Sequence, residues 1–170
     1  MPAKVYYITG GERSGKSSYA QKLALSLTVS PIYLATARVW DDDFRSRIER
    51  HKTDRDNRWT TIEEEISIAG HDYTDKVVLM DCVTLWLTNI FSDNSYNNEK
   101  SIEIAKAEWD ALIRQNFTLI AVSNEIGMGG HGPTEAQRNF TSLQGWMNQY
   151  IAAMADKAYL MVSGIPLVLK

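Results

Sequence analysis

The stretch that decides the fold is Gly10-Gly11-Glu12-Arg13-Ser14-Gly15-Lys16-Ser17, which fits the pattern G-x-x-x-x-G-K-S. The apolar residues 5–9 come directly before it and predict a short buried strand. After the motif, small and apolar side chains recur at the spacing of one helix face, at Ala20, Leu23, Ala24 and Leu27. The motif therefore stands between a strand and a helix, the context that a phosphate-binding loop (P-loop) requires.

The chemistry of such a loop follows from its residue types. Glycines let the backbone bend so that successive N–H groups converge on phosphate oxygens, and the helix N-terminus adds positive partial charge. We expect Lys16 to reach the β- and γ-phosphates and the Ser17 hydroxyl to ligate Mg²⁺. A chance glycine turn is the alternative, which the complete motif and both flanks disfavour. The sequence therefore predicts that residues 10–17 bind a nucleoside triphosphate.

Bulk composition narrows the class of protein. A chain of 170 residues is long enough for a substantial core, and we expect one nucleotide-binding domain over residues 1–170. The formal net charge of −3 disfavours a nucleic-acid-binding function based on bulk positive charge. Cys82 is the single cysteine, which agrees with a reducing compartment. No secretion signal and no apolar stretch of membrane-spanning length is seen, so we expect a cytoplasmic protein without a membrane span.

Strand-like and helical patterns alternate along the chain. After residues 5–9, apolar runs recur at residues 32–36, 77–81, 119–123 and 158–163, and residues 166–169 are expected as a last antiparallel edge strand after a turn at Gly164. Residues 102–113 and 136–154 carry apolar stripes at helical spacing. Continuous apolar runs are typical of a parallel sheet covered on both faces. The pattern predicts an α/β fold with right-handed crossovers.

Two acidic residues follow predicted strands, and open α/β sheets bind ligands at the carboxyl ends of their strands. Asp81 closes the run 77–81, where a carboxylate can hold Mg²⁺ directly or through a water. The alternative for Asp81 is a cap on the following helix. Glu125, in the glycine-rich stretch 123–134, is a candidate second carboxylate for Mg²⁺ or a base for an attacking hydroxyl, and a solvated loop acid is the alternative.

The charged segment 37–65 contains candidate substrate-binding and nucleophilic residues. Its basic side chains, which could cradle a phosphorylated substrate, are Arg45, Arg47, Arg50, Lys52, Arg55 and Arg58. Acidic residues share the segment, so a charged surface helix explains it equally well. His51 would lie along the apolar edge of such a helix, where a histidine is usually a packing residue, although imidazole can also act as a nucleophile. No two histidines have the spacing of a zinc site.

Together these pieces resemble the bifunctional adenosylcobinamide kinase / adenosylcobinamide-phosphate guanylyltransferase family of cobalamin biosynthesis. The matching stretches run in order along the chain, at residues 9–17, 33–37, 42–43, 47–52, 55, 59, 61, 63–64, 81–89, 123–129, 145, 148–149, 155–156 and 163–166. A P-loop alone is generic. The segment Arg47-Ile48-x-x-His51 and the segment Asn124-Glu125-x-Gly127-x-Gly129 in one chain are not generic, and they carry the resemblance.

The resemblance implies a RecA-like P-loop domain that assembles as a homotrimer. The family phosphorylates the aminopropanol hydroxyl of adenosylcobinamide with ATP or GTP. It then transfers GMP from GTP to that phosphate, releasing pyrophosphate and giving adenosylcobinamide-GDP. The transfer runs through a phosphoramidate on a histidine that matches His51, and the matched position Glu63 is expected at the nucleotide.

The chain departs from the family pattern in three places. Asp56 stands where the family usually has proline, residues 130–133 replace a more apolar approach to a proline, and residues 141–142 replace an arginine–aspartate pair. None of these departures involves Lys16, Ser17, His51 or Asp81. Two alternatives remain: a P-loop small-molecule or nucleotide kinase without guanylyl transfer, and a nucleotide-switched interaction module.

Overall fold

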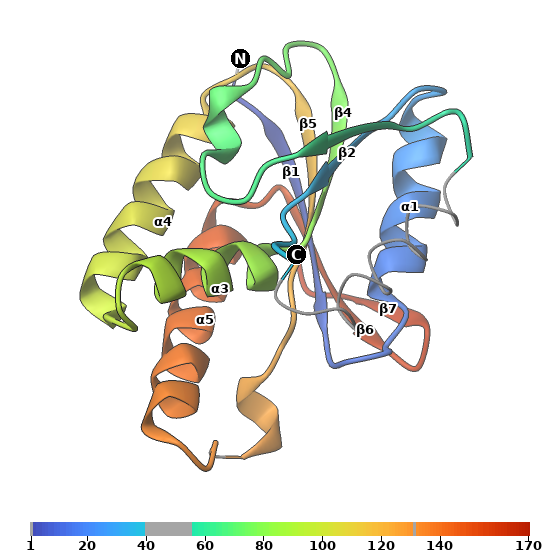
Figure 1. The fold of residues 1–170 in the computed structure, drawn as a ribbon. Coiled ribbons are helices and arrows are strands. Elements are labelled where there is room, and N and C mark those ends of the chain that lie inside the picture. The colour runs from blue at the N-terminus through green and yellow to red at the C-terminus, as the bar shows by residue number, and fades with distance from the viewer. Residues whose placement is uncertain (1, 40–55, 131) are drawn as a thin grey trace.

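The computed structural model describes residues 2–39, 56–130 and 132–170 (Figure 1). Within these residues seven strands form one sheet: β1 (Lys4–Gly10), β2 (Ile32–Ala35), β3 (Thr60–Glu63), β4 (Val77–Asp81), β5 (Thr118–Val122), β6 (Lys157–Val162) and β7 (Ile165–Val168). The helices are α1 (Lys16–Leu27), α3 (Val83–Asp93), α4 (Asn98–Ile113) and α5 (Glu135–Met154), with two short 3₁₀ segments, η1 (Ile68–Gly70) and η2 (Gly127–Gly129).

The sheet is parallel except at one edge. Its strand order is β3-β2-β4-β5-β1-β6-β7, and β7 alone runs antiparallel, paired with β6. The central strand β1 pairs with β5 on one side and β6 on the other, so that Ile8 is in register with Val122 and Tyr159. This confirms the predicted α/β sheet and its C-terminal antiparallel hairpin.

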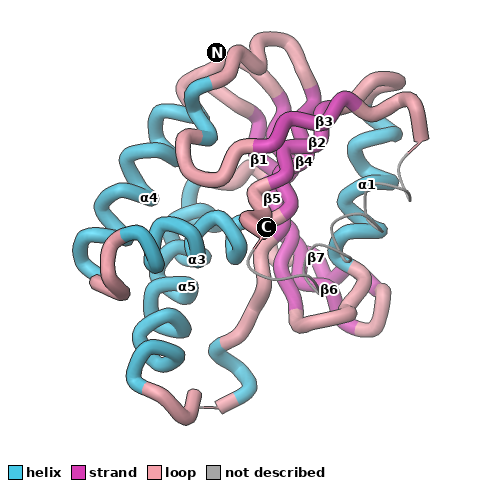
Figure 2. Tube along the Cα trace, viewed as in Figure 1, coloured by secondary structure: helices cyan, strands magenta, loops and turns pink. Residues whose placement is uncertain are grey.

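Helices cover both faces of the sheet. Helix α1 packs on one face, and α3, α4 and α5 pack on the other (Figures 1 and 2). Successive side chains of a strand point to opposite faces, so Val5 and Tyr7 enter the core under α3–α5 while Tyr6 and Ile8 enter the core under α1. Because both faces are apolar, the strand sequences read as continuous apolar runs.

The edge strand β3 is not predicted by its sequence. Its residues are mostly exposed and polar, and it joins the sheet through parallel pairing with β2, in which Glu63 is in register with Ala35. The carboxyl ends of β1, β2, β4 and β5 lie side by side at one end of the strands. The loops that follow these strands form the candidate site. No helix of the described part of the chain is long and apolar enough to cross a membrane.

Candidate nucleotide-binding site

Two glycines of the loop are required by the geometry. A Cβ atom at Gly10 would lie 2.6 Å from the carbonyl oxygen of Met161 and 2.7 Å from the Ser14 Oγ, closer than real Cβ atoms approach. Gly15, which precedes α1, has a φ of +95°, and a Cβ there would lie 3.0 Å from the Cα of Gly164. The motif glycines therefore let the loop pass close to the end of β6.

The C-terminal hairpin supports the loop. Gly164, in the turn between β6 and β7, has a φ of +82° and donates its backbone N–H to the Ser14 carbonyl at 2.9 Å. The two residues are far apart in sequence, so this contact is not visible in the motif. The turn predicted at Gly164 thus packs against the phosphate-binding loop.

Lys16 lies buried at the start of α1. Its side chain bends back into the loop, where Nζ donates to the Gly11 carbonyl and lies 3.5 Å from the Ser14 Oγ. Burial lowers the pKa of the Lys16 ammonium below its ordinary value, and the nearby Asp81 carboxylate offsets only part of this effect. A phosphate beside Lys16 would favour the charged form, so the site suits an anionic ligand.

Asp81 lies at the carboxyl end of β4, in register with Ala35 of β2 and Val122 of β5. Its Oδ2 accepts a hydrogen bond from the Tyr33 hydroxyl at 2.9 Å, and its charge acts on Lys16. The N-cap of α3 is Cys82, which makes no side-chain capping hydrogen bond. Asp81 is therefore held by a neighbouring strand at the edge beside the loop, and the capping alternative finds no support.

A magnesium site would have to draw on few protein ligands. Within residues 2–39, 56–130 and 132–170, no three His, Cys, Asp or Glu side chains gather to hold a metal ion. Mg²⁺ bound to a nucleotide keeps several waters and takes one or two protein oxygens together with phosphate oxygens. The Ser17 hydroxyl in the first turn of α1 and the Asp81 carboxylate fit that limited donor set.

Glu125 meets the loop through its backbone. Its N–H donates to the Gly10 carbonyl at 3.0 Å, so the chain after β5 packs against the start of the loop. Its Oε1 accepts from the Gly127 N–H at 2.9 Å and thus turns toward η2. The backbone of the glycine-rich stretch lies at the loop, while the role of the Glu125 carboxylate stays a prediction.

A buried polar network fixes the end of β5 on α5. The Ser123 hydroxyl donates to Asn148 Oδ1 at 2.7 Å, and Gln144 Nε2 donates to the same oxygen at 2.9 Å. Asn148 Nδ2 then donates to the Asn124 carbonyl at 3.1 Å, while the Asn124 N–H donates to the Thr84 hydroxyl at 3.0 Å. Buried polar groups are costly to leave unpaired, so these bonds define the position of residues 123–125.

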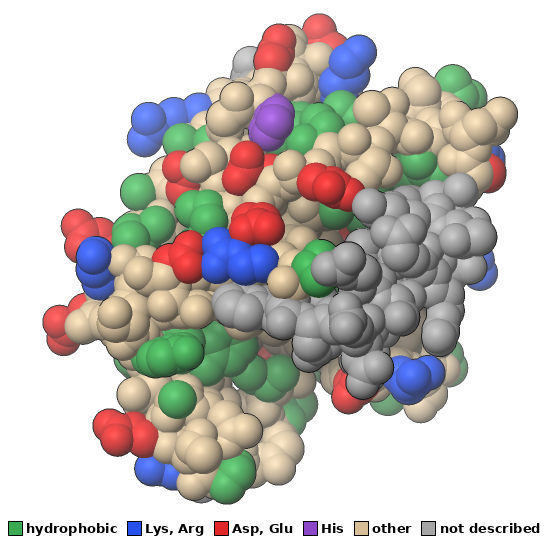
Figure 3. Space-filling view, viewed as in Figure 1, with side chains coloured by type: hydrophobic (Ala, Val, Ile, Leu, Met, Phe, Trp, Pro, Cys, Tyr) green, Lys and Arg blue, Asp and Glu red, His purple; other side chains and the backbone are tan. Residues whose placement is uncertain are grey.

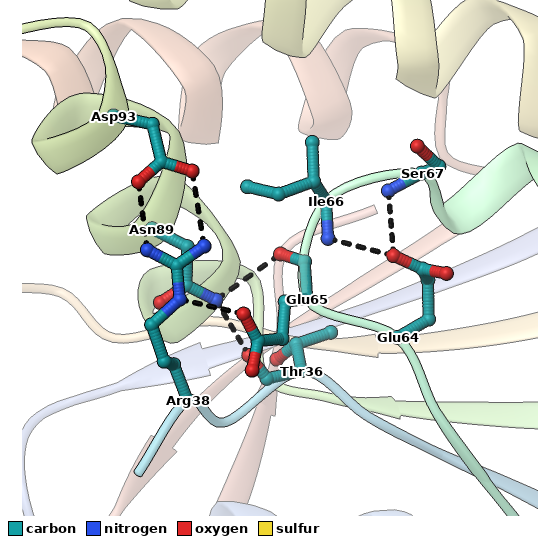
Figure 4. Close-up of polar contacts among 8 residues, drawn as sticks. All are labelled: Thr36, Arg38, Glu64, Glu65, Ile66, Ser67, Asn89 and Asp93. Atoms are coloured by element: carbon teal, nitrogen blue, oxygen red, sulfur yellow. Dashed lines mark hydrogen bonds and ion pairs between the residues drawn. The ribbon is translucent and has the colours of Figure 1, made fainter. Parts of the chain in front are cut away.

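Arg38 and Asn89 join the segments that flank residues 40–55 to α3 (Figure 4). Arg38 pairs with Glu65 at 2.6 Å and with both carboxylate oxygens of Asp93, at 2.7 and 3.0 Å. Asn89 donates to the carbonyls of Thr36 and Glu65, at 2.8 and 3.1 Å. On this face basic and acidic side chains lie next to each other (Figure 3). Sequence reasoning missed these residues because each partner is distant along the chain.

The remaining predicted residues lie in different places. Glu12 and Arg13 are exposed in the loop, and Arg13 has a φ of +54°. Glu63 is exposed at the end of β3, farther along the same sheet edge. Arg58 is exposed and pairs with Asp56 at 2.6 Å. His51, the other basic residues of 45–55, and His131 lie outside the described residues.

A central strand that leads through a glycine loop into a helix beginning with a buried lysine defines a P-loop nucleotide-binding protein. Solved structures share this fold. A Pyrococcus horikoshii OT3 protein matches with a TM-score of 0.52 at 9% identity, covering 99% of this chain and 87% of that one. An ATPase from the type III secretion system of pathogenic bacteria matches with a TM-score of 0.51 at 9% identity, covering 94% of this chain and 51% of that one. At such identities the likeness concerns the fold alone.

Sequence comparison identifies the family. The family model described as cobinamide kinase / cobinamide phosphate guanyltransferase matches residues 6–169. The bifunctional adenosylcobalamin biosynthesis protein CobU of Escherichia coli (strain K12) is 33% identical over 96% of this chain and 98% of its own length. The bifunctional protein CobP of Pseudomonas aeruginosa is 34% identical over 96% and 95%. The chain therefore belongs to the cobinamide kinase / cobinamide phosphate guanyltransferase family, a family of bifunctional enzymes, which confirms the resemblance stated above.

Proposed function

We propose that this chain phosphorylates adenosylcobinamide with ATP or GTP and then transfers GMP from GTP to adenosylcobinamide-phosphate. The observation that carries the proposal is the buried Lys16 in its glycine loop, with Asp81 close by at the carboxyl edge of the sheet. Membership of the family supports the choice of acceptor. The products are adenosylcobinamide-GDP and pyrophosphate.

In the kinase step the acceptor hydroxyl attacks the γ-phosphorus in line with the leaving nucleoside diphosphate. The loop amides and Lys16 hold the β- and γ-phosphates, while Ser17 and Asp81 are the residues that would hold Mg²⁺. The metal ion, when bound, neutralises charge that develops on the transferred group. Glu125, whose backbone contacts Gly10, is the candidate base or second carboxylate.

In the guanylyl step the His51 imidazole attacks the α-phosphorus of GTP. A phosphorus–nitrogen bond forms, the bond to pyrophosphate breaks, and the corrinoid phosphate then displaces the histidine. A neutral imidazole is a competent nucleophile near neutral pH. Lys16 and the loop amides stabilise the leaving pyrophosphate. The role of His51 rests on the family resemblance, since His51 lies outside the described residues, and Glu63 is proposed at the nucleotide on the same basis.

We further propose that residues 1–170 act as one domain in a cytoplasmic homotrimer. The edge strand β7 supports self-association because its apolar side chains are open to solvent, with Ile165 69% and Val168 67% exposed. Sedimentation equilibrium should give the mass of three chains. A monomer at working concentration would contradict the trimer.

A labelling experiment tests the covalent route. Protein incubated with α-labelled GTP and Mg²⁺ should acquire an acid-labile, base-stable label. His51→Ala should lose the label and guanylyl transfer but keep measurable kinase turnover, whereas the control His71→Ala should behave as wild type. Unlabelled wild type would refute the phosphohistidine intermediate, and full guanylyl transfer by His51→Ala would refute the role of His51.

A second assay, in which the protein is incubated with adenosylcobinamide and GTP, separates the two alternatives. A kinase without guanylyl transfer would phosphorylate the corrinoid, with or without His51, and stop there. An interaction module would hydrolyse GTP slowly and leave the corrinoid unmodified. Both outcomes are read from the mass of the corrinoid after incubation with GTP.

A further inference from the structure

We propose that a cavity between α3, α5 and the η2 segment binds the corrinoid part of the acceptor, an inference that rests on the proposed function. The cavity has a volume of about 500 Å³ and is open to solvent, within the range of small-molecule sites. It would take an edge of the macrocycle with its carboxamide side chains, while the rest of the ring faces solvent. Apolar side chains gather on the corresponding face, below α3 (Figure 3).

The position of the cavity suits an acceptor. Ile126, which lines it, directly follows Glu125, whose N–H bonds the Gly10 carbonyl of the phosphate loop. One residue spans about 3.8 Å, so the wall of the cavity begins close to the loop. A short aminopropanol arm could therefore extend from the cavity to a phosphate held by the loop.

The cavity lies on the face of the sheet opposite α1. Helix α1, whose N-terminus would hold the phosphates, covers one face, and the helices α3 and α5 that line the cavity cover the other (Figure 1). An acceptor seated between α3 and α5 approaches the phosphorus from the side away from α1.

Three aromatic side chains form the apolar wall. Phe91 contacts Tyr96 with ring centroids 5.3 Å apart and Phe140 with centroids 5.6 Å apart. Tyr96 is 57% exposed and Phe91 is buried, so Tyr96 presents its ring at the rim of an already packed cluster. Packed aromatic rings offer a rigid apolar surface for the edge of a macrocycle.

The polar part of the wall is neutral. The Thr88 and Thr141 hydroxyls donate to carbonyls of their own helices, those of Thr84 and Gln137, at 2.8 and 2.9 Å. Each hydroxyl oxygen keeps lone pairs that can accept from a carboxamide N–H. The described residues that line the cavity include no charged side chain. This wall disfavours a phosphate and favours the uncharged amides of a corrin ring.

The loop that follows η2 forms another part of the wall. Gly130 and Gly132 of this loop line the cavity together with Thr141 of α5. A Cβ atom at Gly132 would lie 2.6 Å from the Gln137 Cβ, so glycine keeps the loop against the first turns of α5.

The test uses two exposed alanines of α5 as a matched pair. Ala136 lines the cavity, whereas Ala153 lies near the other end of the helix and outside the cavity. Ala136→Phe should raise the KM for adenosylcobinamide in the kinase reaction by about tenfold or more, because the ring fills space that the corrinoid needs. It should leave the Kd for GTP unchanged, and Ala153→Phe should leave both constants unchanged.

An unchanged KM in Ala136→Phe, or an equal rise in both variants, would overturn the proposal. If circular dichroism shows that Ala136→Phe does not fold, the KM for adenosylcobinamide is measured in Thr141→Val instead. Because this variant lacks the hydroxyl oxygen that would accept from a carboxamide, its KM for adenosylcobinamide should rise about threefold to tenfold. An unchanged KM would overturn the proposal. If wild-type protein leaves the corrinoid unmodified, the proposed function fails. If wild type is active and the variants match it, only this placement of the corrinoid fails.

Discussion

The two glycines at the start of the loop give a matched pair for testing why the motif is built as it is. Gly10 is in register with Met161 of β6, and an added Cβ would lie 2.6 Å from the carbonyl oxygen of Met161. This carbonyl belongs to a paired strand and cannot move without disturbing the sheet. An added Cβ at Gly11, by contrast, meets nothing within 4 Å.

We expect Gly10→Ala to lower the free energy of unfolding by about 2–3 kcal/mol, the cost of overpacking a close-packed site. With a urea m-value of about 2 kcal/mol/M, the unfolding midpoint should fall by about 1 M or more. Gly11→Ala should change the free energy of unfolding by less than about 1 kcal/mol. Urea titration of ligand-free protein, followed by circular dichroism, measures both. Equal midpoints for the two variants would refute the argument that close approach of β6 requires Gly10.

Three further predictions follow from individual contacts. Asn89→Ala should cost about 2–4 kcal/mol of unfolding free energy, because it leaves the buried Thr36 carbonyl and the part-buried Glu65 carbonyl without their donor. The control Asn94→Ala, which removes one local bond to Ile90, should cost less than half as much by urea titration, and equal losses would contradict this. Tyr33→Phe, which removes the hydroxyl bonded to Asp81, should raise the Mg²⁺ concentration needed for half-maximal kinase activity, and an unchanged value would show that Tyr33 does not position Asp81. Burial of Glu64 raises its pKa, but hydrogen bonds from the N–H groups of Ile66 and Ser67 (Figure 4), together with the nearby His71 imidazole, outweigh this effect and hold the pKa below its ordinary value of 4.5. The folded state therefore binds fewer protons than the unfolded state, so this stabilisation is present above about pH 4.5 and is lost as the pH falls through the folded pKa. Thermal melts should show Glu64→Gln less stable at pH 7 and less sensitive to acid, and parallel pH profiles for the variant and wild type would contradict this.

The central strands that sequence reasoning predicts are buried on both faces, whereas the predicted edge strand β7 is exposed. Residues 77–81 read as one apolar run and form β4 over the same span, because no solvent face interrupts the pattern. The edge strand β3 has the sequence Thr-Thr-Ile-Glu and lies mostly exposed, so its residues carry no such signal. Its place in the sheet comes from pairing with Ile32–Ala35, a long-range contact that no local pattern encodes.

The candidate site divides in the same way. The loop is predictable from the spacing of its motif, and Asp81 is predictable from its position at the end of an apolar strand. Tyr96 lies in a polar stretch, residues 92–98, for which the sequence suggests no function, yet its ring packs on Phe91 at the rim of a cavity. Phe91 of α3 also contacts Phe140 of α5, so only the folded chain brings the three rings together.

The contact between the C-terminal hairpin and the phosphate-binding loop is also not predictable from the sequence. The bond from the Gly164 N–H to the Ser14 carbonyl joins the two ends of the chain. The sequence predicts a turn at Gly164, but nothing local to it indicates a contact with the phosphate loop. Such contacts depend on strand order, which here places β6 beside β1.

The central claim is that one P-loop site modifies a corrinoid twice. The most direct measurement is the mass of adenosylcobinamide after incubation with purified protein, GTP and Mg²⁺. The account predicts two successive products, the first carrying a phosphoryl group and the second a further guanylyl group, and it predicts neither product from Lys16→Ala. A corrinoid of unchanged mass beside continuing GTP hydrolysis would contradict it.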